Sequence, residues 1–303
     1  MSDAGATDRV LGTVRGAAGP TVVVVAALHG DEPAGLLAAQ AVLEALTRTT
    51  VHGRVVALVG NRRALRKGCR FLAEDLNRGW TAQTLARIAQ PRADEAPEDT
   101  ERRELVDAIA RATDGRPATF VDLHTMSGDG APFVIVPTGA RNDEIGRVVP
   151  APRILGLDER TDGALLPWLS RHGHRGIAIE GGSHGDPAAR EHLAAAVWSV
   201  LSSLGVVDTT RIDPALASLQ VLRARTAALP GAVRVHAQHV IAPGDAFTMV
   251  PGWASFDAVR RGDVIAHDRG GPVVARDDGT LLLPNYAGRG EHGFFVGRGD
   301  ADS

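Results

Sequence analysis

The chain has 303 residues, of which 44% are hydrophobic and 23% charged, and its formal net charge is −3. This composition is typical of a folded protein with room for one large and one smaller domain, and the lack of a lysine- or arginine-rich block argues against a nucleic-acid partner. No apolar run approaches the roughly 20 residues of a membrane span, and MSDAGATDRV lacks a signal-peptide pattern, so we expect a cytoplasmic protein. The single cysteine, Cys69, excludes an intrachain disulfide and a cysteine-only zinc site.

The first two thirds of the chain alternate apolar runs with helical patterns. Residues 21–28, TVVVVAAL, form an unbroken apolar run that predicts a strand buried on both faces, and residues 33–46 follow as a helix. Further strands are predicted over 54–59, 118–123, 133–136 and 176–179, and further helices over 82–89, 100–112 and 188–204. This alternation favours an α/β sandwich with a mostly parallel mixed sheet over residues 1–207.

The pattern changes after about Asp208. Short β-type runs are predicted over 218–224, 233–239, 247–250, 264–267, 273–275 and 281–283. Turn signals such as Pro230-Gly231 and Asp278-Gly279 separate several of them. We therefore expect a small all-β domain over residues 208–303 that shapes the entrance to the site.

A first chemical signal follows directly after the strand predicted over 21–28. It reads His29-Gly30-Asp31-Glu32-Pro33. Side chains at the end of a parallel strand lie at the edge of the sheet where α/β proteins bind ligands, and imidazole and carboxylate are both zinc ligands. The alternative is a turn in which Asp31 or Glu32 supports a helix N-terminus.

A second strand end carries Asp122-Leu123-His124-Thr125. We expect His124 at the same edge of the sheet and Asp122 on the other side of the chain, where it can support the site without being a ligand. Two histidines and Glu32 leave one zinc position open for water, as catalytic zinc requires. A lone histidine is more often structural, but the pair with Glu32 is harder to explain in that way.

Two further stretches carry candidate groups. Residues 69–78, CRFLAEDLNR, form an irregular segment whose arginines and asparagine suit a bound anion, although a solvated surface loop is the alternative. Glu180 ends an apolar strand and precedes two glycines, a setting that can raise its pKa and make it a base. The alternative is a surface glutamate.

HGDE, the DLNR segment, DLHT and the strand that ends at Glu180 occur in one order. Together they resemble the succinylglutamate desuccinylase/aspartoacylase family, a branch of the zinc carboxypeptidase-like fold. The resemblance implies that His29, Glu32 and His124 are the ligands of one Zn²⁺ per chain. It implies that Arg70 polarises the scissile carbonyl, that Asn77 and Arg78 bind a substrate carboxylate, and that Glu180 is the general base.

The chain departs from aspartoacylase at one position. In that enzyme an arginine upstream of the catalytic glutamate binds the side-chain carboxylate of the substrate, and here an ungapped register places Ser170 there. Arg171 is the replacement after a small shift, and Tyr286 is the candidate for the family's C-terminal tyrosine. His172, His174 and His184 lie near the site in sequence, without an assigned role.

These residues predict a zinc-dependent amidohydrolase that removes an acetyl- or succinyl-type group from an N-acyl amino acid or related amine. A carboxypeptidase-type peptidase or another amide hydrolase on the same scaffold is the first alternative. A non-catalytic protein that binds zinc or a ligand is the alternative from another class, but it does not explain why the base is kept with the ligands. We expect a small-molecule substrate, no nucleic acid and no membrane, and leave a homo-oligomer open.

Overall fold

In residues 8–288 and 290–300, which the computed structural model describes, eleven hydrogen-bonded strands form one mixed sheet. Their order is β1-β3-β2-β4-β7-β5-β6-β8-β14-β13-β10. The strands are β1 (Val10–Arg15), β2 (Ala17–Ala26), β3 (His52–Val59), β4 (Thr119–Met126), β5 (Phe133–Val136), β6 (Arg153–Leu155), β7 (Arg175–Ser183), β8 (Ala232–Val240), β10 (Ala258–Val259), β13 (Gly279–Leu282) and β14 (His292–Gly299). A second sheet contains β9 (Thr248–Met249), β11 (Val264–Asp268) and β12 (Gly271–Val274).

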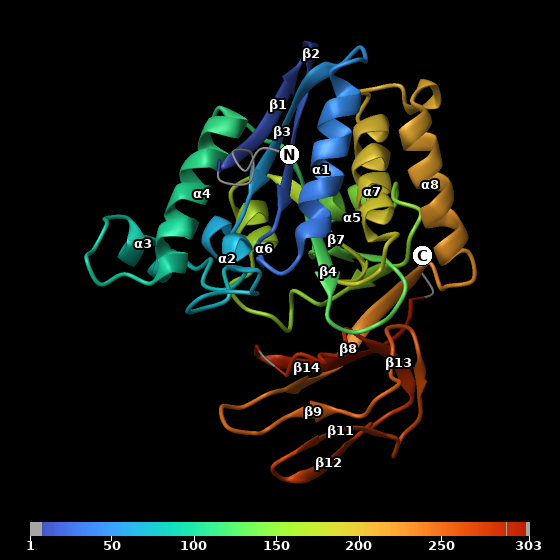
Figure 1. Ribbon diagram of the computed structural model, residues 1–303. Helices are drawn as coiled ribbons and strands as arrows, with labels where there is room; N and C mark the ends of the chain where they lie inside the picture. The colour runs from blue at the N-terminus through green and yellow to red at the C-terminus, as the bar shows by residue number, and fades with distance from the viewer. Residues whose placement is uncertain (1–7, 289, 301–303) are drawn as a thin grey trace.

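Helices cover both faces of the first half of the large sheet (Figure 1). They are α1 (Pro33–Leu46), α2 (Arg62–Lys67), α3 (Ala82–Ile88), α4 (Pro97–Thr113), α5 (Ala140–Gly146), α6 (Leu165–Arg171), α7 (Ala189–Ser203) and α8 (Asp213–Thr226), with a short 3-10 turn, η1 (Thr209–Arg211). Val22 and Val24 of β2 join the core that contains α1 and α7, whereas Val23 and Val25 join the core that contains α4 and α6. Successive strand residues point to opposite faces, so the unbroken apolar run fills two cores.

The strands β3, β2, β4 and β7 are parallel neighbours, so their carboxyl ends meet at one edge. The strand β5 is antiparallel to β7, which makes the sheet mixed. Both findings confirm the fold class predicted from the sequence. No helix in the described ranges is both long and apolar enough to cross a membrane.

The region after Asp208 begins with a helix, and the β-type run predicted over 218–224 is wrong. The buried side chains of α8 are Ala215, Ser218, Leu222 and Thr226, which recur at intervals of three and four residues. That spacing gives one helical face, which packs against α7. The strand β8 then pairs with β6 and carries the large sheet into the C-terminal β region.

The β region, residues 232–300, packs directly on the loop that follows β4. The Ser255 amide donates to the Asp129 carbonyl at 2.8 Å, and Gly130 forms an isolated bridge with Ser255. A Cβ at Gly128 would lie 2.5 Å from the Pro284 carbonyl oxygen, so only glycine allows this close approach. The β region therefore lies against the strand end that carries His124.

Candidate metal centre and active site

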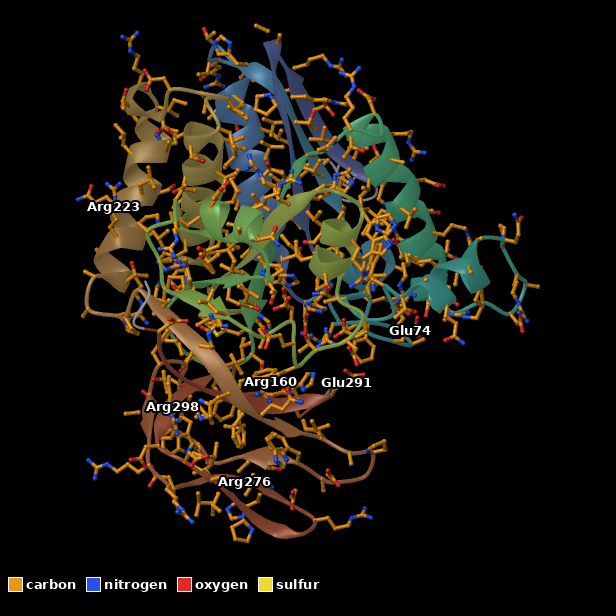
Figure 2. All side chains as sticks on the ribbon, turned by 180° about the vertical axis from the view of Figure 1, so that it is seen from behind. Glu74, Arg160, Arg223, Arg276, Glu291 and Arg298 are labelled. Carbon is orange, nitrogen blue, oxygen red and sulfur yellow. The ribbon has the colours of Figure 1, made fainter. Side chains whose placement is uncertain are left out.

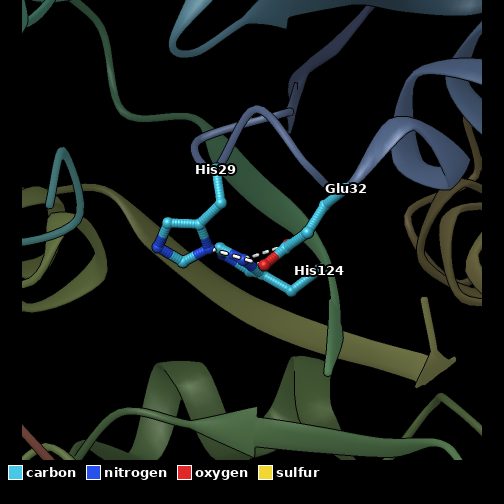
Figure 3. Close-up of side chains that lie close together, drawn as sticks. All are labelled: His29, Glu32 and His124. Carbon is cyan, nitrogen blue, oxygen red and sulfur yellow. Dashed lines mark hydrogen bonds and ion pairs between the residues drawn. The ribbon is translucent and has the colours of Figure 1, made fainter. Parts of the chain in front are cut away.

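His29, Glu32 and His124 converge at the carboxyl edge of the sheet (Figure 3). His29 Nδ1 lies 2.7 Å from Glu32 Oε1, and His124 Nδ1 lies 3.0 Å from Glu32 Oε2. The three side chains offer ligand atoms within 4.8 Å of one another, and their residues are only 5%, 1% and 4% exposed. Buried imidazole and carboxylate groups in this arrangement could hold a metal ion.

The backbone around His29 explains how the motif reaches this position. Ala27, directly before Leu28, adopts φ 56°, a left-handed conformation that is uncommon without glycine and turns the chain out of β2. A Cβ at Gly30 would lie 2.2 Å from the backbone carbon of Ala64 in α2. The glycine of the motif is therefore required by the close packing of α2.

The outer nitrogens of both histidines face carboxylates. His29 Nε2 lies 3.1 Å from Asp75 Oδ1, and His124 Nε2 lies 3.0 Å from Asp122 Oδ2. The expectation that Asp122 points to the other side of the chain is wrong, because residues two apart on a strand share a face. Carboxylates behind histidines fix the ring orientation in metal sites. The sequence showed Asp75 only as part of the DLNR segment, with no sign of this contact.

The electrostatics keep Glu32 in its anionic form. Burial raises the pKa of this carboxyl, but His29 and His124 outweigh burial and hold the pKa well below its ordinary value. An ionised carboxylate with two imidazoles is a donor set that suits zinc. The residues present therefore fit the metal that the resemblance implies.

Glu180 lies on β7 next to His124 on β4, as its partner in the strand register. The residue is 8% exposed, and its Oε2 atom has no hydrogen-bond partner in the parts of the chain that the structure describes. Burial raises the pKa of its carboxyl to about 7. Glu180 is thus a buried carboxyl, with one oxygen unpaired within the described residues, beside the His29–Glu32–His124 group.

The segment between α2 and α3 brings Arg70, Asn77 and Arg78 to the same cleft. Arg70 Nη2 donates to Asp75 at 2.9 Å, and its Nη1 lies 3.6 Å from Glu32 Oε1. The Leu165 amide donates to Asn77 Oδ1 at 2.9 Å, which joins the segment to α6. Arg78 Nε donates to Glu291 at 3.2 Å, and Figure 2 shows Glu291 at the junction with the β region.

Two buried charges one turn apart on α4 hold this segment in place. The Glu98 carboxylate is fully buried and accepts the amides of residues 72, 73 and 74 at 2.7, 3.1 and 3.4 Å. Arg102, also fully buried, donates to the Arg78 carbonyl at 2.8 Å. The helix pattern alone indicated α4 but not these contacts, because they join residues about 25 positions apart.

The cleft at this edge is lined by both charged and apolar side chains. Its apolar lining comes from both the α/β part, before residue 232, and the β region. The apolar lining residues are Met126, Ile135, Pro137, Leu157, Ala164, Leu166, Pro167, Ala178, Leu283, Pro284, Ala287 and Phe295. The cleft is also lined by the charged and polar side chains of His29, Glu32, His124, Glu180, Arg70, Asn77 and Arg78. The β region thus forms part of the wall without adding a residue to the His29–Glu32–His124 group.

Two predicted substrate-binding residues lie elsewhere. Arg171 is exposed and donates to the Trp80 carbonyl at 3.4 Å. The Tyr286 hydroxyl donates to the carbonyls of Val250 and Trp253, at 3.1 and 2.8 Å, within the β region. Neither side chain is among the residues that line the cleft, so the register chosen for them from the sequence does not bring them to it.

The three neighbouring histidines divide in the same way. His184 lines the cleft, and its Nδ1 lies 2.8 Å from the Thr125 hydroxyl. His172 packs on Trp168, and His174 accepts the Ala118 amide at 3.2 Å, and neither residue lines the cleft. Only His184 is therefore placed where it can meet a ligand.

Residues 18–141 match the model of the succinylglutamate desuccinylase/aspartoacylase catalytic domain. The resemblance to this family is confirmed. The match contains the His29–Glu32–His124 group and the segment that carries Arg70, Asn77 and Arg78, and it ends before Glu180. A search among curated proteins found no match.

Solved structures of this family share the fold. A succinylglutamate desuccinylase/aspartoacylase from Rhodobacter sphaeroides superposes with a TM-score of 0.67 at 20% identity, over 96% of this chain and 88% of the other. The product-bound ectoine utilization protein EutE (DoeB) from Ruegeria pomeroyi gives 0.65 at 20% identity, over 94% and 86%. A succinylglutamate desuccinylase from Vibrio cholerae gives 0.61 at 17% identity, over 92% and 81%.

Proposed function

We propose that this chain is a zinc-dependent hydrolase that removes an acyl group from an N-acyl amino acid. The observation that carries the proposal is the placement of Glu180, a buried carboxyl without a partner in the described residues, beside the His29–Glu32–His124 cluster. The family match over residues 18–141 supports the deacylase chemistry.

His29, Glu32 and His124 would hold the zinc ion, which when bound supplies a Lewis acid and lowers the pKa of a coordinated water toward about 7. Glu180 accepts a proton from the attacking water and delivers it to the leaving amine. Burial raises the pKa of this carboxyl above its ordinary value, which favours its role as a proton acceptor. Asp75, hydrogen-bonded to His29, and Asp122, which lies 3.0 Å from His124 Nε2, would support the two imidazoles.

The two arginines of the cleft, Arg70 and Arg78, have separate proposed roles. Arg70, 3.6 Å from a ligand carboxylate, would stabilise negative charge on the carbonyl oxygen of the scissile amide. Arg78 and Asn77 would bind the substrate carboxylate, and a guanidinium is well suited to this because it pairs with both carboxylate oxygens. In the free protein Arg78 Nε donates to the exposed Glu291 carboxylate at 3.2 Å, so its partner there is already a carboxylate.

The test is a hydrolysis screen of the zinc-loaded protein over N-acetyl and N-succinyl amino acids, read by release of the free amine. The chelated protein is the control, and short peptides with a free C-terminus represent the peptidase alternative. Hydrolysis of N-acyl amino acids that stops on chelation and returns with zinc is expected. Turnover of the peptides alone would favour the peptidase, and turnover of nothing would favour a binding protein.

A further inference from the structure

The cleft wall beside the carboxylate-binding pair is apolar. The bond from the Leu165 amide to Asn77 Oδ1 places the start of α6 next to that pair, and the following residue, Leu166, lines the cleft. On the floor, Ala178 of β7 and Ile135 of β5 are register partners, and both line the cleft. Ala178 is two residues from Glu180 and shares its face of the strand. The apolar patch formed by Leu166, Ile135 and Ala178 therefore adjoins both the base and the carboxylate site.

The cleft also lacks a second carboxylate-binding cation. Among the described residues that line it, only Arg70 and Arg78 carry a guanidinium or ammonium group. Arg70 forms an ion pair with Asp75. Arg78 pairs with Glu291 in the free protein and, in the proposed function, with the α-carboxylate of the substrate. Arg160 lies near the junction with the β region (Figure 2) but is not among the lining residues.

Three further ionisable groups of the wall, Asp158, Glu291 and His292, would repel a second substrate carboxylate or leave it unpaired. Asp158 and Glu291 line the cleft as carboxyl groups. His292 lines it too, but burial and the neighbouring Arg78 lower the pKa of its imidazole, so it adds no positive charge at neutral pH. Burial of an unpaired carboxylate against apolar side chains is strongly unfavourable.

We propose that the amino-acid half of the substrate carries an uncharged, apolar side chain, which packs on Leu166, Ile135 and Ala178 while Arg78 and Asn77 hold its α-carboxylate. This inference rests on the proposed function and narrows it. It excludes acylated aspartate and glutamate as preferred substrates of this chain. The specificity-determining residue is Leu166, because it contacts the cleft next to the position of the carboxylate pair.

The experiment compares N-acetyl derivatives of leucine, methionine, aspartate and lysine on the zinc-loaded protein, so that only the side chain varies. We expect kcat/KM for leucine and methionine to exceed that for aspartate and lysine by at least about 100-fold, the scale that mismatched pocket contacts give. Equal or faster turnover of the aspartate derivative would overturn the inference. A preference for the lysine derivative would also overturn it, because Asp158 or Glu291 would then bind the ammonium group of the substrate side chain. Turnover of none of them, with no turnover of the matching N-succinyl series, would overturn the proposed function, and the inference with it.

Two variants test the assignment to this patch. Leu166→Arg should lower the leucine-to-aspartate ratio of kcat/KM at least about tenfold, because it adds the missing cation. Leu216→Arg, at an exposed site on α8, adds the same charge outside the cleft and should leave the ratio unchanged. Zinc content and melting temperature show whether each variant is folded. If Leu166→Arg does not fold, Ile135→Ala tests the same patch. Its larger pocket should raise the ratio of kcat/KM for N-acetylphenylalanine to kcat/KM for N-acetylleucine relative to wild type. An unchanged ratio in a folded variant would refute the assignment.

Discussion

Replacing Glu180 by glutamine separates catalysis from metal binding. The side chain keeps nearly the same shape, but the amide cannot accept the proton of the attacking water. Because Glu180 lies beside the ligand cluster without belonging to it, we expect zinc content and fold to be retained. The loss of a positioned general base typically costs 10²- to 10⁴-fold in rate, so kcat should fall by at least about 100-fold, which is about 2.7 kcal/mol of transition-state stabilisation. The value of KM should change much less.

The assay needs zinc content and kcat measured on the same samples of wild type and variants. Glu32→Gln should behave in the opposite order, with weaker metal binding as the primary defect, because both of its oxygens face the histidines. Glu191→Gln, on the outer surface of α7, is the matched control and should leave both quantities unchanged. Near-wild-type turnover of zinc-loaded Glu180→Gln would refute the reasoning, and His184 would be the next candidate for the base.

Three further changes probe the surroundings of the site. Arg78→Ala should raise KM for free-acid substrates by an amount that corresponds to about 2–5 kcal/mol, the cost of removing one partner of a buried charge pair. Equal cleavage of free-acid and amidated substrates by the wild-type protein would contradict the role of Arg78. Asp122→Asn should weaken zinc binding by about 10- to 100-fold, measured by competition with a chelator, and an unchanged affinity would show that this carboxylate does not support His124. Glu98→Gln should raise KM and lower the unfolding free energy by about 1–3 kcal/mol, since three backbone amides lose a charged acceptor. Zinc content should stay constant. A parallel loss of zinc would mean that Glu98 does not act mainly on the segment 70–78.

The elements that position the site were predictable from local pattern. The apolar run before His29 and the helix from Pro33 to Leu46 follow from burial on both faces and from helical periodicity, and the structure has both. The convergence of His29 and His124 at one edge also followed, because both end parallel strands. The family resemblance supplied the roles of the remaining groups, which local pattern alone leaves ambiguous.

Contacts between distant parts of the chain were not predictable in this way. Arg102 appeared only as a polar residue of the helix predicted over 100–112, and Glu98 lay just before that helix. Nothing in their spacing indicates which loop they bind. Tyr286 shows the same limit, since its hydroxyl bonds to carbonyls more than 30 residues away, within the β region. Residues 218–224 predict a strand because their apolar residues suit either structure, whereas in the structure they lie in α8, whose packing on α7 decides between the two.

The central claim is that hydrolysis depends on a metal held by His29, Glu32 and His124. The most direct test measures zinc and amine release on the same preparations of wild type and His124→Ala, before chelation, after chelation and after zinc is restored. We expect about one zinc per wild-type chain, activity that disappears and returns with the metal, and a variant that loses most of both. Wild-type hydrolysis that persists in the chelated, zinc-free protein would contradict it.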